Sequence, residues 1–237
     1  LARLLVKREL AHLRQRGHTI NVSEETYQEL LSQGYDVVGT DIIPFATSPV
    51  RFEQADLCDR SAVDQLLRGA EAVIHLGAIP GPRKPAANST ASPSVTFSDD
   101  PFVIFENNVA STLNVLMLAG EHKLRRVVFS SSVFAMGWAN DPRAFEPLYL
   151  PLDEDHPPMP FEPYGLSKLV GECIAGMVAR TSTTSVVSLR FSNVVPVDRQ
   201  GELPWPAPTP ENPLTLVMWS YADPRDVAEA HVKALEA

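Results

Sequence analysis

The sequence contains little cysteine, little positive charge and no long apolar run. Two of its 237 residues are cysteine, and neither Cys58 nor Cys173 stands in a CxxC or histidine-cluster spacing, which argues against a disulfide framework and a metal site. Lysine and arginine total 20 against 29 aspartate and glutamate, so the formal net charge is −9 at pH 7. Without a basic stripe to neutralise phosphates, we expect no nucleic-acid partner.

Two further absences concern location. No uninterrupted apolar run reaches the roughly 18 residues of a membrane-spanning helix, and no apolar segment ends in a small-residue cleavage site. We therefore expect a soluble, cytoplasmic protein with a small-molecule substrate and no membrane partner. The composition, 44% hydrophobic and 21% charged, is that of an ordinary globular protein.

Short apolar runs alternate with helical patterns from about residue 35 onward. Runs rich in Val, Ile and Leu predict strands at 35–41, 50–57, 71–78, 125–132 and 185–191. Apolar residues at helical spacing predict helices at 61–69, 105–120, 164–180 and 223–237. Near-continuous apolar strands separated by helices are typical of a parallel sheet covered on both faces, so the fold class is α/β with a doubly wound, mostly parallel sheet.

The carboxyl ends of the strands are where such folds bind their ligands. The strand 125–132 ends in three serines, and after a proline-rich loop the next helix carries Tyr164 and, one turn later on the same face, Lys168. A phenol with a pKa of about 10 is a poor base at neutral pH, and a neighbouring cation favours its phenolate. A serine could donate to a substrate oxygen. The alternative is that Tyr164 and Lys168 are two ordinary residues on the side of a helix.

Several segments, in this order along the chain, together resemble the extended short-chain dehydrogenase/reductase family, specifically its NAD-dependent epimerase/dehydratase branch. They are "GYDVVGTD" (34–41), "ADLCD" (55–59), "AVIHLGA" (72–78), "ENNVASTLNVL" (106–116), "RRVVFSSSVFAMG" (125–137), "PYGLSK" (163–168), "VVSLRFSNV" (186–194) and "YADPRDVAEAHVKAL" (221–235). The resemblance covers residues 28 to 237. It implies a single Rossmann-like domain over 1–237, with an atypical N-terminal segment (1–27), a dinucleotide-binding core (28–200) and the start of a substrate-binding part (201–237) that is truncated.

The resemblance also implies roles for individual residues. Tyr164 corresponds to the catalytic tyrosine, and Lys168 to the lysine that also holds the nicotinamide ribose. Ser132 corresponds to the catalytic serine, because Gly137 follows it five positions later as in the family's "SSSxxVYG", with Ser131 as the fallback. Asn108 and Asn193 fall where the family contacts substrate; the alternatives are a helix-surface asparagine and a loop cap.

For the cofactor, the resemblance implies NAD. An acidic side chain at the end of the second strand, here Asp41, accepts hydrogen bonds from the adenosine ribose diol and repels a 2′-phosphate, so NAD is preferred over NADP. The alternative is that Asp41 only begins a turn before Pro44. The remaining cofactor-binding residues implied by the family are Gly17, Asp56, Leu57, Gly77, Ala78 and Ser130.

The N-terminal region departs from the family pattern. The family has a strand, a GxxGxxG loop and then a helix whose N-terminus holds the pyrophosphate. An ungapped count places Gly17, Ile20 and Ser23 at the three glycine positions, and isoleucine at the second would crowd the phosphates. Ser23 is predicted to be the N-cap of a helix with two acidic residues, Glu24 and Glu25, in its first turn. Residues 1–17 are predicted to form a basic amphipathic helix rather than a first strand.

Two functional hypotheses follow. The first is an NAD-dependent enzyme that moves hydride at a secondary alcohol of a sugar, nucleotide sugar or similar substrate, with dehydrogenase or reductase ranked first and epimerase close behind. No Asp–Glu pair follows Ser132, where a dehydratase would carry one. The second is a non-catalytic relative whose cofactor binding is impaired by the degraded glycine loop. In either case the family's mode of association predicts a homodimer through helices 105–120 and 164–180.

Overall fold

Six parallel strands form one sheet in the computed structural model, which describes residues 3–7, 22–42, 44, 48–80, 100–138, 146–195, 197–202 and 220–237. The strands are β1 (Arg3–Lys7), β2 (Asp36–Asp41), β3 (Arg51–Gln54), β4 (Ala72–His75), β5 (Arg126–Ser132) and β6 (Ser185–Phe191). Their order is β3-β2-β1-β4-β5-β6, the order of the dinucleotide-binding Rossmann fold. The prediction of a doubly wound parallel sheet is confirmed.

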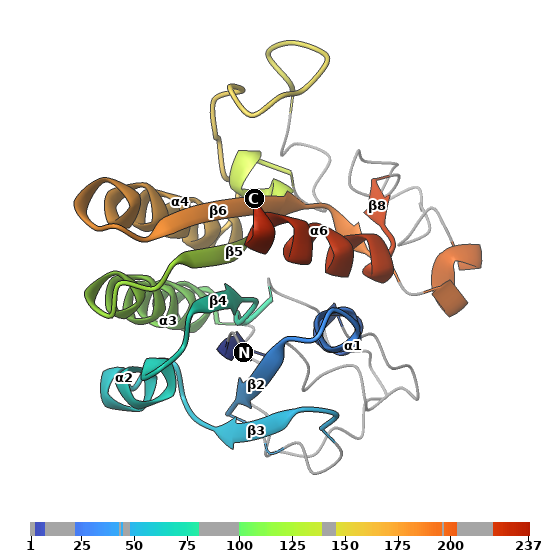
Figure 1. The fold of residues 1–237 in the computed structure, drawn as a ribbon. Coiled ribbons are helices and arrows are strands. Elements are labelled where there is room, and N and C mark those ends of the chain that lie inside the picture. The colour runs from blue at the N-terminus through green and yellow to red at the C-terminus, as the bar shows by residue number, and fades with distance from the viewer. Residues whose placement is uncertain are drawn as a thin grey trace.

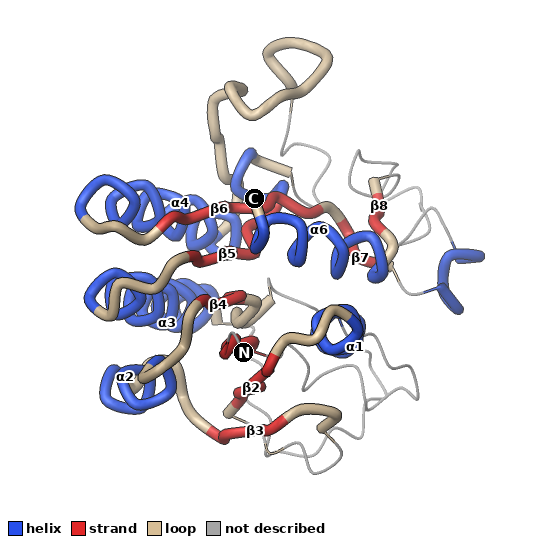
Figure 2. The backbone as a smooth tube through the Cα atoms, viewed as in Figure 1, coloured by secondary structure: helices blue, strands red, loops and turns tan. Residues whose placement is uncertain are grey.

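Helices cover both faces of this sheet (Figures 1 and 2). On one face lie α2 (Arg60–Leu67), α3 (Pro101–Glu121) and α4 (Pro163–Thr181), and on the other lie α1 (Val22–Ser32) and α6 (Pro224–Glu236). Each face has its own core. Val127 of β5 packs in the cluster under α2, α3 and α4, and its neighbour Val128 packs in the cluster under α1 and α6. Side chains alternate between the faces as strand geometry requires.

The predicted elements from residue 35 onward match the structure to within a few residues, but two N-terminal predictions are wrong. Residues 3–7 form β1, in the middle of the sheet between β2 and β4, where a helix was predicted over 1–17. The short run "RLLVK" suits either state by itself, and pairing with strands on both sides decides in favour of the strand. The next helix begins at Val22, so Ser23 lies inside its first turn and is not its N-cap.

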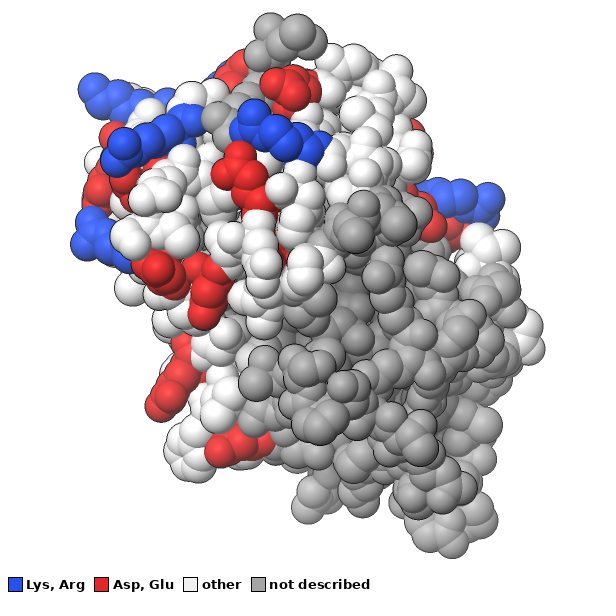
Figure 3. Space-filling view, turned by 90° about the horizontal axis from the view of Figure 1, so that it is seen from below, with Lys and Arg blue, Asp and Glu red and all other residues white. Residues whose placement is uncertain are grey.

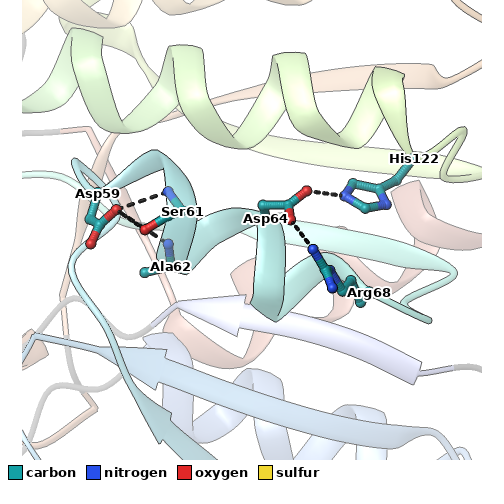
Figure 4. A network of polar contacts seen from close by, with 6 residues as sticks. All are labelled: Asp59, Ser61, Ala62, Asp64, Arg68 and His122. Carbon is teal, nitrogen blue, oxygen red and sulfur yellow. Dashed lines mark hydrogen bonds and ion pairs between the residues drawn. The ribbon is translucent and has the colours of Figure 1, made fainter.

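Helix α2 shows how local polar contacts fix the element boundaries (Figure 4). Its N-cap is Asp59, whose carboxylate accepts hydrogen bonds from the backbone N–H groups of Ser61 and Ala62. One turn later Asp64 contacts Arg68 on its own helix and His122 at the C-terminal end of α3, at 2.7 and 2.8 Å. Hydrogen bonds from Arg68 and then His122 lower the pKa of the Asp64 carboxyl. Asp64 therefore ties α2 to α3.

A second parallel pair, β7 (Asn193–Val194) with β8 (Tyr221–Ala222), lies beyond the end of β6, and short 3-10 helices follow β5 (Val133–Met136) and β7 (Val197–Glu202). On the face in Figure 3, basic side chains lie among acidic ones in the upper part, and the coloured side chains at the lower left are acidic.

By length and composition α3 would be able to cross a membrane, so the sequence criterion of an uninterrupted apolar run was too strict. Of its most apolar window, 44% is buried within the described part of the protein.

Candidate active site

Residues predicted to act on the cofactor and substrate gather at one edge of the sheet. Because the strands are all parallel, the carboxyl ends of β2, β4 and β5 lie at the same edge and carry Asp41, Gly77 and Ser132 respectively. The first turn of α4 meets this edge through the 3-10 helix after β5. There Gly165 lies so close to the carbonyl oxygen of Phe134 that a Cβ would overlap it.

The serines that end β5 have different hydrogen-bond partners. The Ser131 hydroxyl donates to Glu172 of α4 at 2.5 Å, and Glu172 in turn pairs with Arg190 of β6. The Ser132 oxygen accepts a hydrogen bond from the backbone N–H of Phe134 at 3.2 Å. That contact leaves the Ser132 hydroxyl proton available for another acceptor. Ser131 is therefore engaged within the protein, and Ser132 is the better candidate for contact with a substrate oxygen.

Helix α4 begins where it does because of Glu162 and Pro163. Proline at the first helical position has the required φ and needs no hydrogen-bond acceptor. The Glu162 carboxylate, as N-cap, accepts from the backbone N–H of Tyr164 at 2.8 Å and of Gly165 at 2.5 Å. Burial raises the pKa of Glu162, and these two hydrogen bonds partly oppose that rise. The cap fixes the backbone of Tyr164 itself.

The loop before α4 is also fixed by polar contacts. The buried ring of His156 accepts from the Leu148 backbone N–H at 3.1 Å and donates to the Pro157 carbonyl at 3.0 Å. Further on, the Met159 N–H donates to the carbonyl of Met136, which ties the loop to the 3-10 helix after β5. The proline-rich approach to Tyr164 is thus an ordered part of this edge over its described residues, 146–162.

Tyr164 and Lys168 lie together. Lys168 is 4% exposed, and its Nζ donates to the Ser130 carbonyl at 2.7 Å and lies 5.6 Å from the centroid of the half-buried Tyr164 ring. Its Nζ also lies 5.2 Å from the centroid of the Phe129 ring. The edge of Phe134 packs on Tyr164 with the ring centroids 5.9 Å apart. A buried lysine beside a tyrosine, at the carboxyl end of a central strand, is not a pair on an open helix surface.

Asn108, predicted to contact substrate, is buried rather than on the helix surface, with 2% of its surface exposed. Its amide makes a reciprocal pair with the main chain of Ile79, accepting from the N–H at 2.6 Å and donating to the carbonyl at 2.9 Å, and donates to the hydroxyl of Ser167 at 3.2 Å. Asn108 therefore joins the segment after β4 to the residue preceding Lys168. Asn193 lies in β7 rather than in a loop. Substrate contact by either asparagine stays a prediction.

The residues predicted to hold the adenosine half follow β2 and β3. Asp41 is 6% exposed at the end of β2, and its carbonyl accepts from the Ala55 N–H. Asp56 is exposed and forms a turn by accepting from the Cys58 N–H at 2.9 Å. The side chain of Leu57 belongs to the core under α2 and α3, so a contact with adenine would have to use its main chain.

At the end of β4, Gly77 is buried and Ala78 is half-buried. Gly17 and Ile20 lie outside the described residues, whereas Glu24 and Glu25 fall in the first turn of α1, as predicted. Contact of Gly77, Ala78 or the start of α1 with a dinucleotide stays a prediction.

The sequence prediction missed His231 of α6 entirely. Its side chain is fully buried, and its Nε2 lies 2.5 Å from the Ser130 hydroxyl oxygen. Burial lowers the pKa of His231 to about 4, against the opposing effect of a hydrogen bond to the Val227 carbonyl. The helical spacing of Val227, His231 and Leu235 in the sequence could have indicated that His231 lies on the buried face of its helix.

Comparison with known proteins agrees with this geometry. A putative UDP-glucose 4-epimerase of Methanocaldococcus jannaschii is 30% identical over 73% of this chain and 52% of its own length. A short-chain dehydrogenase/reductase superfamily protein from Agrobacterium tumefaciens, solved with bound NAD, has 30% identity and a TM-score of 0.61, and the match covers 81% of this chain and 50% of that one. The chain spans about half the length of the curated relatives it matches.

A UDP-glucose 4-epimerase from Brucella ovis, solved with NAD, is 22% identical with a TM-score of 0.70 over 100% of this chain and 73% of its own, which shows the shared fold. The family model of the NAD dependent epimerase/dehydratase family matches residues 17–203, which include both the serines of β5 and the pair on α4. By this match and the shared architecture, the chain belongs to the NAD dependent epimerase/dehydratase family.

Proposed function

We propose that the chain binds NAD and takes part in hydride transfer at a secondary alcohol of a nucleotide sugar or a similar small substrate. Tyr164 acts as the general base that takes the hydroxyl proton, and Lys168 stabilises the phenolate and holds the nicotinamide ribose. Ser132 donates a hydrogen bond to the reacting oxygen as carbonyl character develops. When bound, NAD supplies the hydride acceptor.

One observation carries the proposal: the buried ammonium of Lys168 lies between the Ser130 carbonyl, at 2.7 Å, and the ring of Tyr164, at 5.6 Å from its centroid. A buried cation requires compensation by nearby polar or charged groups. The rings of Phe129 and Tyr164 both contact this cation, but only Tyr164 carries a hydroxyl whose ionised form the cation would stabilise. Stabilisation of a phenolate is therefore the function that we assign to Lys168.

Asp41 and Asp56 would receive the adenosine half of the dinucleotide. The buried Asp41 carboxylate would accept from the ribose hydroxyls and repel a 2′-phosphate, which favours NAD over NADP. Gly77 and Ala78, after β4, offer small side chains where the dinucleotide approaches the main chain. These assignments follow the family and rest on the position of each residue at the carboxyl edge of the sheet.

For the substrate, the curated relative in Methanocaldococcus is named as a putative UDP-glucose 4-epimerase. We therefore infer a UDP-sugar as the substrate class, and oxidation at its C4 hydroxyl as the first step. In a dehydrogenase the reaction would end there, and in an epimerase hydride would return to the other face of the sugar. We rank epimerisation ahead of simple oxidation, and the similarity to a protein named as a putative epimerase supports that ranking.

A second candidate function is a non-catalytic relative. It is favoured by Ile20 and Ser23, which stand where two of the glycines are expected, and by the acidic first turn of α1. NADH titration followed by nicotinamide fluorescence separates the two candidates. Saturable binding by this chain at micromolar NADH supports the enzyme, and binding that appears only after Ile20→Gly with Ser23→Gly supports the scaffold. Absence of binding in both would contradict the NAD proposal.

We also propose a homodimer through α3 and α4. Apolar side chains stand exposed on these neighbouring helices: Phe102, Val103, Leu113, Met117 and Leu166. The family commonly pairs the two helices into a four-helix bundle, which would bury this surface. Leu113→Glu should shift the chain from dimer to monomer in light scattering after gel filtration. A monomer in the unmodified chain at micromolar concentration would refute the proposal.

A further inference from the structure

The ammonium of Lys168 contacts a main-chain carbonyl of β5. Its Nζ donates to the Ser130 carbonyl at 2.7 Å and lies over the rings of Phe129 and Tyr164. The position of that carbonyl therefore contributes to the position of the cation. A small rotation of the Ser130 peptide would move the ammonium relative to the tyrosine.

Ser130 is in turn fixed from the opposite face of the sheet. Lys168 lies on α4, on one face, whereas the Ser130 hydroxyl lies 2.5 Å from Nε2 of His231 on α6, on the other (Figure 1). On the same strand, Ser131 donates to Glu172 of α4. Two consecutive serines thus tie the end of β5 to helices on both faces, as the alternation of a strand allows.

The hydrogen bonds of His231 assign its protons. Its Nδ1 lies 2.7 Å from the Val227 carbonyl, which can only accept, so Nδ1 carries the proton. In the neutral ring Nε2 is then the acceptor, and the Ser130 hydroxyl is the donor. The ring is fully buried and packs against Phe191 with the centroids 5.0 Å apart, an environment that keeps it neutral.

We propose that His231 is a positioning residue for the active site: by holding the Ser130 side chain from α6, it orients the Ser130 carbonyl that fixes the Lys168 ammonium beside Tyr164. The catalytic role of Lys168 rests on the proposed function. The linkage from His231 through Ser130 to Lys168 can be tested in the folded chain without cofactor or substrate. Packing would need only an apolar ring at position 231. Hydrogen bonds at both ring nitrogens, by contrast, fix the orientation of the His231 ring and of the Ser130 hydroxyl.

The direct test is the NMR signal of the Lys168 side chain in protein labelled with ¹³C-lysine and assigned by its loss in Lys168→Met. The aromatic rings around Nζ make the chemical shift of the Cε group sensitive to its position. We expect the signal to move in His231→Phe, which keeps a ring, and in Ser130→Ala, which removes the hydroxyl and keeps the carbonyl. If His231→Phe fails to fold, Ser130→Ala decides the outcome.

The matched control is His122→Phe. His122 also joins two helices through a hydrogen bond, but its side chain contacts Asp64 of α2, at 2.8 Å, rather than a serine of β5 (Figure 4). We expect the Lys168 signal to stay in place in this variant. An unchanged signal in both His231→Phe and Ser130→Ala would overturn the proposal, as would an equal change in His122→Phe.

NADH affinity provides a second readout. Loss of one buried hydrogen bond that orients Lys168 should weaken NADH binding about tenfold in His231→Phe and Ser130→Ala, and leave His122→Phe unaffected. If the unmodified chain does not bind NADH, the proposed function fails, and the NMR result still decides whether His231 positions Lys168. If NADH binds equally to all variants, His231 has no part in cofactor binding and the positioning role is refuted.

Discussion

Two parts of the proposed dinucleotide site differ in what holds them. At the nicotinamide end, Tyr164 and Lys168 are fixed by contacts from several elements: the Glu162 cap, the Ser130 carbonyl and the ring of Phe134. At the diphosphate in the middle, the family relies on glycines, and the sequence offers Ile20 where the second is expected. The nicotinamide part depends on contacts made by side chains, and the diphosphate part depends on the space that glycines leave.

This difference has a physical consequence. Side-chain contacts at the nicotinamide end support one another, so a change in one weakens the arrangement by degrees. A glycine that admits a phosphate acts by leaving space, and a branched side chain there removes the space at once. We therefore expect a substitution at the nicotinamide end to have a graded effect and a substitution in the glycine loop to have an all-or-none effect.

The largest effect is expected for Lys168→Met. Loss of the ammonium removes the cation beside Tyr164 and the predicted ribose contact, so hydride transfer should slow by about 100-fold or more. The measurement is the rate of UDP-glucose turnover with NAD. Ser131→Ala is the control, because its hydroxyl is engaged with Glu172. Turnover that is equally slow in both would show that the β5 edge, rather than the lysine, limits the rate.

Gly165→Ala should disturb the same end by a steric route. A Cβ at position 165 would overlap the Phe134 carbonyl, which belongs to the main chain and cannot swing away. Overpacking of this kind costs about 1–3 kcal/mol, and displacement of Tyr164 should also reduce turnover. Gly176→Ala on the same helix meets only the end of Arg180, at 3.2 Å, and is the control by thermal unfolding. Equal melting temperatures of the two variants would contradict this packing.

Asp41→Asn tests the adenosine half, on the other side of the diphosphate from the nicotinamide. Loss of the carboxylate should weaken NADH binding by about tenfold, the value of a hydrogen bond to a charged group, and remove the repulsion of a 2′-phosphate. The ratio of NADPH to NADH affinity should therefore rise, as measured by fluorescence titration. An unchanged ratio would mean that Asp41 only supports the turn after β2.

The last prediction concerns pH and His231. Its pKa of about 4 in the folded protein is below the ordinary value near 6.5, so between these pH values the unfolded chain binds more protons. The free energy of unfolding should therefore fall as the pH drops from about 6.5 to about 4, by up to roughly 3 kcal/mol. Urea unfolding of His231→Phe should lack this slope. The same slope in the variant would assign it to other groups.

Much of the fold could be predicted from local pattern. Apolar spacing gave α3, α4 and α6, and valine-rich runs gave β2, β4, β5 and β6, because those signals are read within one element. The N-terminal strand was missed because "RLLVK" has no local preference strong enough to decide. Its state comes from pairing with β2 and β4, which are distant in sequence.

The candidate site was predictable in part for the same reason. The order of Ser132, Tyr164 and Lys168 is a sequence motif, and the structure brings the strand end and the helix together at one edge. The contact of Ser130 with His231, 101 residues away, depends on how α6 crosses the sheet. The burial of Asn108 depends likewise on the segment after β4. No sequence motif within α6 or α3 predicts either contact.

A single turnover with enzyme in excess over UDP-glucose, at saturating NAD, tests the central claim most directly. The account predicts that the unmodified chain forms reduced nicotinamide or the C4 epimer, and that Tyr164→Phe, which keeps the ring and its packing against Phe134, forms neither. Equal product from both proteins would contradict the account, and so would NADH binding by the unmodified chain without any product from a panel of UDP-sugars.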